Sequence, residues 1–183
     1  VELARLKKGE KVFIQAGSGG VGTFAIQLAK HLGATVATTT STHNVAFVKG
    51  LGADTVIDYK TQAFADVLRD CDVVLNSQDA TTLKQSIGVL KNGGKLISIS
   101  GPPDPAFAQA IGAPLFVRMV MRLLSSGIRR MTQRRSIEYT FLFMRPSGSQ
   151  LREITALFDA GVIRPVVDRV FPFESTNEAM AHV

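Results

Sequence analysis

Sulfur and imidazole ligands are scarce in this chain, which has one cysteine, Cys71, and three widely separated histidines among 183 residues. A single cysteine cannot form an intramolecular disulfide, and a cysteine-rich structural zinc site within the chain is excluded. We therefore predict no metal centre in this segment, ordinary surface or packing roles for the histidines, and an unreactive Cys71.

Long hydrophobic runs are also missing. No apolar run approaches the roughly 18 residues that span a bilayer, and residues 1–5 lack the pattern of a signal peptide. The expectation is a cytoplasmic globular protein. Hydrophobic residues make up 45% of the chain, which is enough for one sizeable domain with its own core.

Acidic residues are absent from positions 105–137, where six arginines account for the whole net charge of +6. A polar stripe on an otherwise apolar helix is predicted by the helical spacing of Arg118, Arg122, Ser125 and Arg129. One local basic patch is weak evidence for nucleic-acid binding, so we expect none. Three roles stay open for this helix: packing on another domain or subunit, a wall of a substrate pocket, and peripheral contact with an anionic membrane.

The most informative segment that is present joins an apolar strand beginning at Lys11 to a glycine-rich turn and a helical pattern. The spacing Gly17-x-Gly19-x-x-Gly22, in this context, forms the dinucleotide-binding fingerprint. The first glycine is expected to allow the tight turn, the second to let the backbone approach a pyrophosphate, and the third to let the helix close onto the strand. The helix N-terminus adds free N–H groups and partial positive charge. We therefore expect the phosphates at Gly17, Ser18, Gly19, Gly20, Val21 and Gly22.

Strands and helices alternate after this turn. Strands are predicted at 34–40, 54–59, 72–76 and 95–100, and helices at 44–50, 64–69 and 81–90. This alternation predicts an α/β fold of the Rossmann type, with a doubly wound parallel sheet in three layers. The rhythm then changes, and the patterns predict a helix over 105–131, a strand over 137–144, a helix over 150–160, a short strand over 166–171 and a last helix over 174–183.

Several landmarks follow one another in order along the chain. They are the glycine loop with Ala25 to Lys30 and Gly33 to Val36, and then Leu51 to Asp54, Val56 to Tyr59, Leu90 to Lys95 and Phe171 to Phe173. Together they resemble the cofactor domain of the medium-chain dehydrogenase/reductase superfamily. The later landmarks are similar to the zinc-independent NADPH:quinone oxidoreductase-like branch.

This resemblance implies that residues 1–183 form a single NADP-binding Rossmann domain, cut from a longer chain with an N-terminal substrate domain and a final C-terminal return. It implies a parent enzyme that transfers a hydride between NADPH and a quinone, an enone or a similar carbonyl-conjugated small molecule. The isolated segment is then expected to be inactive. A zinc-dependent alcohol dehydrogenase-type parent with ligands outside this segment, a methyltransferase and a non-catalytic binding module remain alternatives.

The choice between NAD and NADP is expected near the end of the second strand. NAD-binding proteins usually place an acid about 20 residues past the glycine loop, but residues 39–44 contain no carboxylate. Hydroxyl and amide groups in this stretch can donate to a 2′-phosphate, as can the end of the neighbouring strand. We therefore expect NADP(H), held by Thr40, Ser41, Asn44, Tyr59 and Lys60.

The nicotinamide is expected across the carboxyl ends of the fourth and fifth strands, where open α/β sheets bind ligands. This places it near Asn76, Ser77, Ser100 and Gly101, and the resemblance adds Phe141, Leu142 and Phe143. No acid–base or nucleophilic set stands out, so no catalytic residue is assigned.

An apolar strand at 137–144 on the edge of the sheet needs a cover. Members of the resembled family commonly dimerise by pairing such strands across a two-fold axis. We therefore expect a homodimer through residues near 137–144.

Overall fold

The computed structural model describes residues 2–182 and confirms the Rossmann-type α/β fold. Within these residues six strands form one sheet in the order β3-β2-β1-β4-β5-β6, and every neighbouring pair is parallel. All carboxyl ends therefore lie along one edge of the sheet. The strands are β1 (Lys11–Ile14), β2 (Thr35–Thr40), β3 (Thr55–Asp58), β4 (Cys71–Asn76), β5 (Leu90–Ser98) and β6 (Glu138–Phe141).

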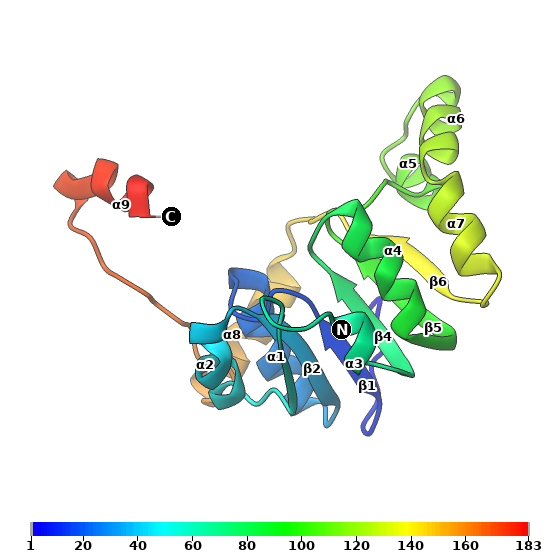
Figure 1. Cartoon of the computed structure of the whole chain (residues 1–183). Coiled ribbons are helices and arrows are strands. Elements are labelled where there is room, and N and C mark those ends of the chain that lie inside the picture. Colours follow the sequence, from blue (N-terminus) through cyan, green and yellow to red (C-terminus); the bar gives the residue numbers. More distant parts are fainter. Residues whose placement is uncertain (1, 183) are drawn as a thin grey trace.

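Helices cover both faces of the sheet (Figure 1). They are α1 (Gly20–His31), α2 (Val45–Gly50), α3 (Phe64–Val67), α4 (Ala80–Val89), α5 (Pro105–Ala110), α6 (Leu115–Leu124), α7 (Ser126–Gln133), α8 (Gly148–Asp159) and α9 (Thr176–His182), with short 3₁₀ turns at Thr42–Asn44 and Phe173–Ser175. No helix within residues 2–182 is long and apolar enough to cross a lipid bilayer.

The core divides into two layers because alternate side chains of the central strand β1 point to opposite faces. Val12 and Ile14 pack with Ile26 of α1 and Val48 of α2. Phe13 points to the other face and packs with residues of α3, α4 and α7. These two apolar layers enclose the sheet and give the predicted three-layer arrangement.

The predicted strand at 166–171 is wrong. This stretch is extended but belongs to no strand, and it leads away from the sheet to α9, drawn in orange and red in Figure 1. Val167 is 66% and Val170 81% exposed. The residues have the β-branched composition of a strand, but a strand also needs a neighbour to accept and donate its backbone hydrogen bonds, and none lies beside them within residues 2–182.

The single helix predicted over 105–131 is three helices, α5, α6 and α7. Gly112 adopts φ 66° and Pro114 precedes α6, so the first break is built from residues that end helices. The second break follows α6 at Ser125, which is fully buried and donates to the Met121 carbonyl. Ser125 therefore does not belong to an exposed polar stripe.

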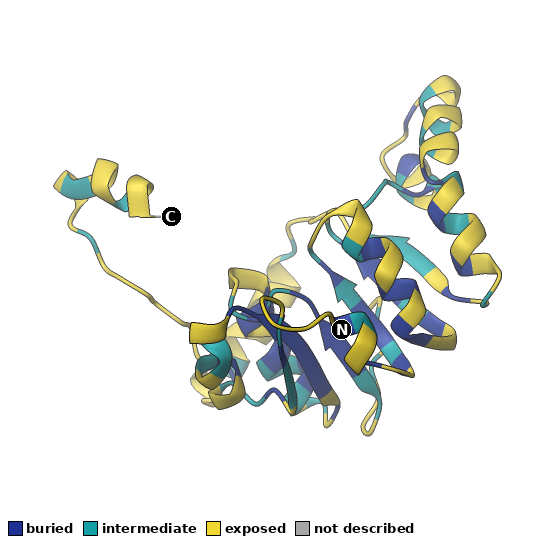
Figure 2. Ribbon diagram, in the orientation of Figure 1, coloured by how far each residue is buried: buried dark blue, intermediate teal, exposed yellow. Residues whose placement is uncertain are grey.

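Other boundaries differ by smaller amounts. The strand predicted at 137–144 ends at Phe141, and the strand predicted from Lys95 begins at Leu90. The last helix ends at His182 in the structure, and the prediction for Val183 lies outside the described residues. Figure 2 shows that α6 and α9 are mostly exposed.

Candidate functional site

The glycine loop between β1 and α1 turns at Ala16 and not at the first glycine. Ala16 has φ 51°, in the left-handed region. A Cβ on Gly17 would lie 2.2 Å from Thr38 Oγ1 of β2, so the first glycine is required by the close approach of the neighbouring strand. The predicted loop is present, but the reason for its first glycine was wrong.

The third glycine lets α1 approach the end of β1, as predicted. A Cβ on Gly22 would lie 2.2 Å from the Ala16 carbonyl oxygen and 2.7 Å from Gly17 Cα. Gly20, in contrast, faces open space, and a Cβ added there would meet no atom within 4 Å. The loop is therefore tight on its sheet side and open at the helix N-terminus.

The first turn of α1 has unused donors. Gly19 is the N-cap and offers no side chain to the turn. The N–H groups of Gly20, Val21 and Gly22 have no hydrogen-bond partner within residues 2–182, whereas the next N–H, that of Thr23, donates to the Gly19 carbonyl over 3.0 Å. Three free N–H groups at the positive end of a helix suit an anion.

The residues expected to select NADP come together at the ends of β2 and β3. Thr40 Oγ1 donates to Ser18 Oγ over 3.0 Å, and the Tyr59 N–H donates to the Thr40 carbonyl over 3.1 Å. Asn44 Nδ2 donates to Ser41 Oγ over 3.3 Å. Thr40 and Ser41 are buried, while the Tyr59 side chain is 61% exposed. Thr40 thus links the ends of these two strands to the glycine loop.

Asp58 is an acid at this place that the sequence reasoning missed. Its carboxylate accepts the Lys60 N–H over 2.9 Å. A hydrogen bond from the Thr42 side chain, helped by the Lys60 N–H, holds the pKa of Asp58 below its ordinary value. Residues 39–44 contain no acid, but the parallel pairing of β2 and β3 places Asp58 opposite Thr40.

The residues expected near the nicotinamide also come together. Asn76 ends β4, and its Oδ1 accepts from Ser98 Oγ over 2.7 Å and from Ser100 Oγ over 3.2 Å. The Leu142 N–H donates to the Ser98 carbonyl over 2.8 Å, which places the end of β6 beside them. Ser77 is half-buried, and its Oγ donates to the Gln15 carbonyl over 3.4 Å. The Asn76 side chain itself is fully buried.

Two more polar residues, not anticipated from the sequence, extend this cluster into the core. Asn76 Nδ2 donates to Gln15 Oε1 over 2.7 Å, and Gln15 Nε2 donates to Ser86 Oγ of α4 over 2.8 Å. Gln15, Asn76, Ser86 and Ser98, which we call the buried relay, are each at most 2% exposed. One sequence feature could have indicated this cluster: the polar residue Gln15 directly follows the apolar stretch of β1.

Asp104 is a further buried residue that the sequence reasoning missed. Its Oδ1 accepts the Phe107 N–H over 2.7 Å and caps α5, while its Oδ2 accepts the Phe141 N–H over 3.0 Å. The Phe107 ring packs against the rings of Phe141 and Phe143, with centroids 5.1 and 5.5 Å apart. Asp104 thus fixes α5 beside the end of β6.

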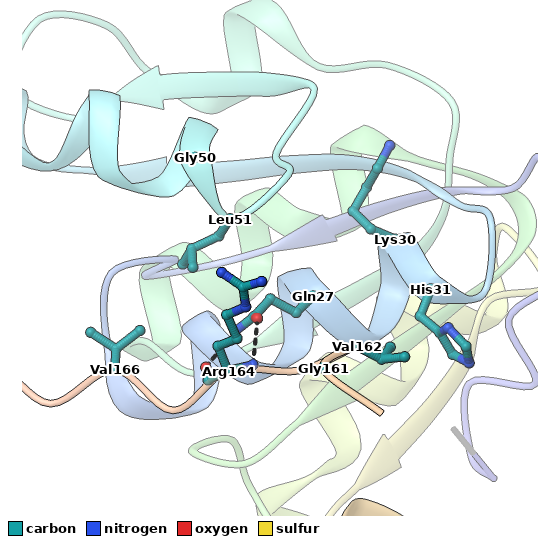
Figure 3. Close-up of a pocket in the computed structure, with 9 residues that line it drawn as sticks. All are labelled: Gln27, Lys30, His31, Gly50, Leu51, Gly161, Val162, Arg164 and Val166. Atoms are coloured by element: carbon teal, nitrogen blue, oxygen red, sulfur yellow. Dashed lines mark hydrogen bonds between the residues drawn. The ribbon is translucent and has the colours of Figure 1, made fainter. Parts of the chain in front are cut away.

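A pocket of about 360 Å³ lies elsewhere, beside the C-terminal half of α1 (Figure 3). Gln27 Oε1 accepts the Arg164 N–H over 2.9 Å and Gln27 Nε2 donates to the Arg164 carbonyl over 3.1 Å. These bonds hold the segment that follows α8 against α1. None of the residues expected to bind a cofactor lines this pocket, so it is not assigned to the cofactor.

Cys71 is fully buried, and burial raises the pKa of its thiol to about 11. It is therefore an unreactive thiol at neutral pH, as predicted. No group of three or more His, Cys, Asp or Glu side chains within residues 2–182 is arranged to hold a metal ion. The described residues do not fit a zinc site.

An all-parallel Rossmann sheet with a glycine loop leading into α1 defines a dinucleotide-binding α/β domain. A family model described as zinc-binding dehydrogenase matches residues 51–183. The chain belongs to this family, and with it to the medium-chain dehydrogenase/reductase superfamily, on the quinone-oxidoreductase-like side. The predicted superfamily is confirmed.

Similarity to individual proteins supports this family assignment. NAD(P)H oxidoreductase RTN4IP1, mitochondrial, of Danio rerio is 36% identical over 180 residues, covering 95% of this chain and 46% of that protein. NADPH-dependent alkenal/one oxidoreductase, chloroplastic, of Arabidopsis thaliana is 28% identical over 179 residues, covering 96% and 38%. The solved structure of the quinone oxidoreductase from Coxiella burnetii has a TM-score of 0.79 at 27% identity, covering 99% and 51%. The chain spans about half the length of RTN4IP1 and of the solved quinone oxidoreductase.

The two glycines of the helix start give the first prediction. Gly22→Ala should lower the free energy of unfolding by about 1–3 kcal/mol, because its Cβ would overlap backbone atoms. Gly20→Ala is the matched control, and it should leave stability unchanged or raise it by up to about 1 kcal/mol, as expected for alanine in a helix. Urea unfolding followed by circular dichroism measures both, and equal losses would contradict the close packing of α1 on β1.

Proposed function

We propose that this chain is the NADP(H)-binding domain of an NADPH-dependent reductase. The observation that carries the proposal is the set of free N–H groups of Gly20, Val21 and Gly22, which open beside the polar ends of β2 and β3. A helix start with three free donors and no side-chain cap within residues 2–182 fits a pyrophosphate. The family to which the chain belongs supports the same conclusion.

The protein groups divide into three sets along the carboxyl edge. The glycine loop and the first turn of α1 hold the pyrophosphate. Ser41, Asn44 and Lys60, at the ends of β2 and β3, hold the 2′-phosphate. NADPH, when bound, supplies a hydride, and the turn after β5 with the end of β6 orients the ring that carries it. Orientation and exclusion of water are the contributions expected of this domain, since a hydride transfer depends on alignment of donor and acceptor.

The substrate class we propose is an electron-poor alkene or quinone conjugated to a carbonyl. The names of the relatives, a quinone oxidoreductase and an alkenal/one oxidoreductase, support it. A substrate domain outside residues 1–183 would complete the cleft, in keeping with the share of its relatives that this chain covers.

Cofactor preference gives the second prediction. We expect NADPH to bind about tenfold or more tightly than NADH, a difference of about 1.4 kcal/mol. Ser41→Asp should remove or reverse this preference, because it adds a second carboxylate beside Asp58 where the 2′-phosphate is expected. Titration of the chain with each cofactor, followed by nicotinamide fluorescence, measures both.

Two further variants accompany this experiment, one as a charge control and one as a test of Asp58. Gln85→Asp adds the same charge on an exposed position of α4 and should leave the preference unchanged. Asp58→Asn removes the nearby carboxylate and should strengthen NADPH binding. Equal affinity of the unmodified chain for NADPH and NADH would overturn the choice of NADP.

Catalysis by the chain alone gives the third prediction. Residues 1–183 should bind NADPH but reduce quinones or enones at a rate near that of the uncatalysed reaction, because the wall that holds the substrate belongs, in our proposal, to the domain outside these residues. A stopped-flow assay of NADPH oxidation with a simple quinone tests this. Turnover at rates typical of enzymes, above about 1 per second, would mean that these residues form a complete active site.

We also propose that the chain forms a homodimer through β6. This strand lies at the edge of the sheet, and its partner on the inner side is β5. The Leu142 N–H points toward β5 and the Phe141 N–H points away from it, to Asp104. A second copy pairing with β6 would replace this contact and cover the exposed apolar residues that follow the strand, as edge strands require.

The fourth prediction separates the backbone of Phe141 from its side chain. Phe141→Pro removes the outward N–H without touching the β5 ladder, and it should give a folded monomer. Phe141→Ala loses the ring but keeps the N–H, and it should remain a dimer. Sedimentation velocity distinguishes monomer from dimer. If the proline variant dimerises with the same dissociation constant as the unmodified chain, this interface is ruled out.

The exposed apolar side of α6 fits packing against the substrate domain or the second subunit, and this remains our preferred role for it. Its exposed residues include Leu115, Phe116 and Leu123. A small-molecule substrate and a second copy of the chain are thus the proposed partners, with no nucleic acid. A cytoplasmic location remains a prediction, and RTN4IP1 is named as mitochondrial.

A further inference from the structure

The buried relay runs in one direction from backbone to backbone. It begins at the Gly101 N–H, which donates to Ser98 Oγ over 2.8 Å. It ends at Ser86, whose hydroxyl donates to the Thr82 carbonyl over 2.8 Å. A backbone N–H can only donate and a carbonyl can only accept, so each hydroxyl and amide between them has one possible orientation.

The relay joins three neighbouring strands at the edge where the cofactor is expected. Gln15 follows β1, Asn76 ends β4 and Ser98 ends β5, and these strands are adjacent in the sheet. No buried side-chain nitrogen or oxygen within residues 2–182 lacks a partner. Since the members are removed from water, successive hydrogen bonds strengthen one another and fix the relative positions of the strand ends.

The turn after β5 is held from its other side by Tyr139 of β6. The Tyr139 hydroxyl donates to the Pro102 carbonyl over 2.7 Å. Burial, reinforced by the charge of Asp104, raises the pKa of Tyr139 above its ordinary value, so its hydroxyl remains a donor. A Cβ on Gly101 would lie 2.7 Å from the Tyr139 hydroxyl oxygen and 2.8 Å from Ser98 Oγ. The backbone of Gly101 is therefore clamped between the relay and β6.

We propose that the buried relay positions the nicotinamide half of NADP(H) without touching it, by fixing the backbone of residues 98–101 at the carboxyl end of β5. Ser98 is the central positioning residue, because it receives the Gly101 N–H and donates to Asn76. This inference rests on the proposed NADP(H)-binding function. The adenine half is held instead by the ends of β2 and β3, which make no hydrogen bond to Ser98.

The experiment compares NADPH with adenosine 2′,5′-bisphosphate, which carries the adenine half and the 2′-phosphate but no nicotinamide. Ser98→Ala should raise the dissociation constant of NADPH about tenfold, the effect of losing about 1.4 kcal/mol of positioning. The dissociation constant of the bisphosphate should change less than about twofold. Isothermal titration calorimetry on the whole chain measures both. A purely structural role of Ser98 would weaken the two ligands alike.

Ser125→Ala is the matched control, since Ser125 is equally buried but bonds only within the α6–α7 region. It should leave both dissociation constants unchanged. Should Ser98→Ala not fold, Ser98→Cys fills the same space with a weakly hydrogen-bonding thiol and should weaken NADPH alone, about threefold.

The experiment distinguishes failure of the relay proposal from failure of the proposed function. Unchanged NADPH affinity, or equal losses for the two ligands, in the variant that folds would overturn the relay proposal and leave the proposed function in place. A loss of NADPH affinity in Ser125→Ala as large as that in the Ser98 variant would also overturn it. Failure of the unmodified chain to bind either ligand would overturn the proposed function and the relay proposal with it.

Discussion

The contact between α1 and the end of β1 is the constraint on which the rest of the site depends. Because Gly22 has no side chain, its backbone can pack against the Ala16 carbonyl. This close packing allows α1 to begin a few residues after β1 ends. The helix start then opens at the carboxyl edge of the sheet, and its first three N–H groups have no acceptor within residues 2–182. The close packing of α1 and the position of its free N–H groups at this edge therefore both depend on the missing side chain of Gly22.

Local pattern was sufficient to predict the parallel core. The strands ending at Ile14, Thr40 and Asn76 are short, apolar or β-branched, and they are separated by helical patterns, so sequence period alone indicates them. The local pattern gave wrong predictions for segments whose structure depends on contacts with residues far away in the sequence. Residues 166–171 have strand composition but no strand to pair with among the described residues, and the 105–131 region breaks at Ser125, whose buried hydroxyl has no sequence signature.

The candidate site was predicted in outline, because the carboxyl ends of parallel strands must share an edge. The carboxylate of Asp58 and the buried amide of Gln15 were not predicted. Asp58 approaches Thr42 only because β2 and β3 pair in register. Gln15 accepts a hydrogen bond from Asn76, which accepts one from Ser98, so these residues are linked only across three strands. The partners of these residues lie on other strands, so the local sequence does not show which groups they bind, and these contacts between strands fix the geometry of this edge. The relay holds the β5 side of the site, while the glycine loop holds the α1 side.

The most direct test of NADP(H) binding at the glycine loop is an amide NMR spectrum of the isotope-labelled chain, recorded during titration with NADPH. We expect the largest shifts at the amides of Gly20, Val21 and Gly22, because their N–H groups would gain a phosphate acceptor. The result that would contradict this site is a response confined to the pocket beside Gln27 and Arg164, with the three glycine-loop amides unmoved.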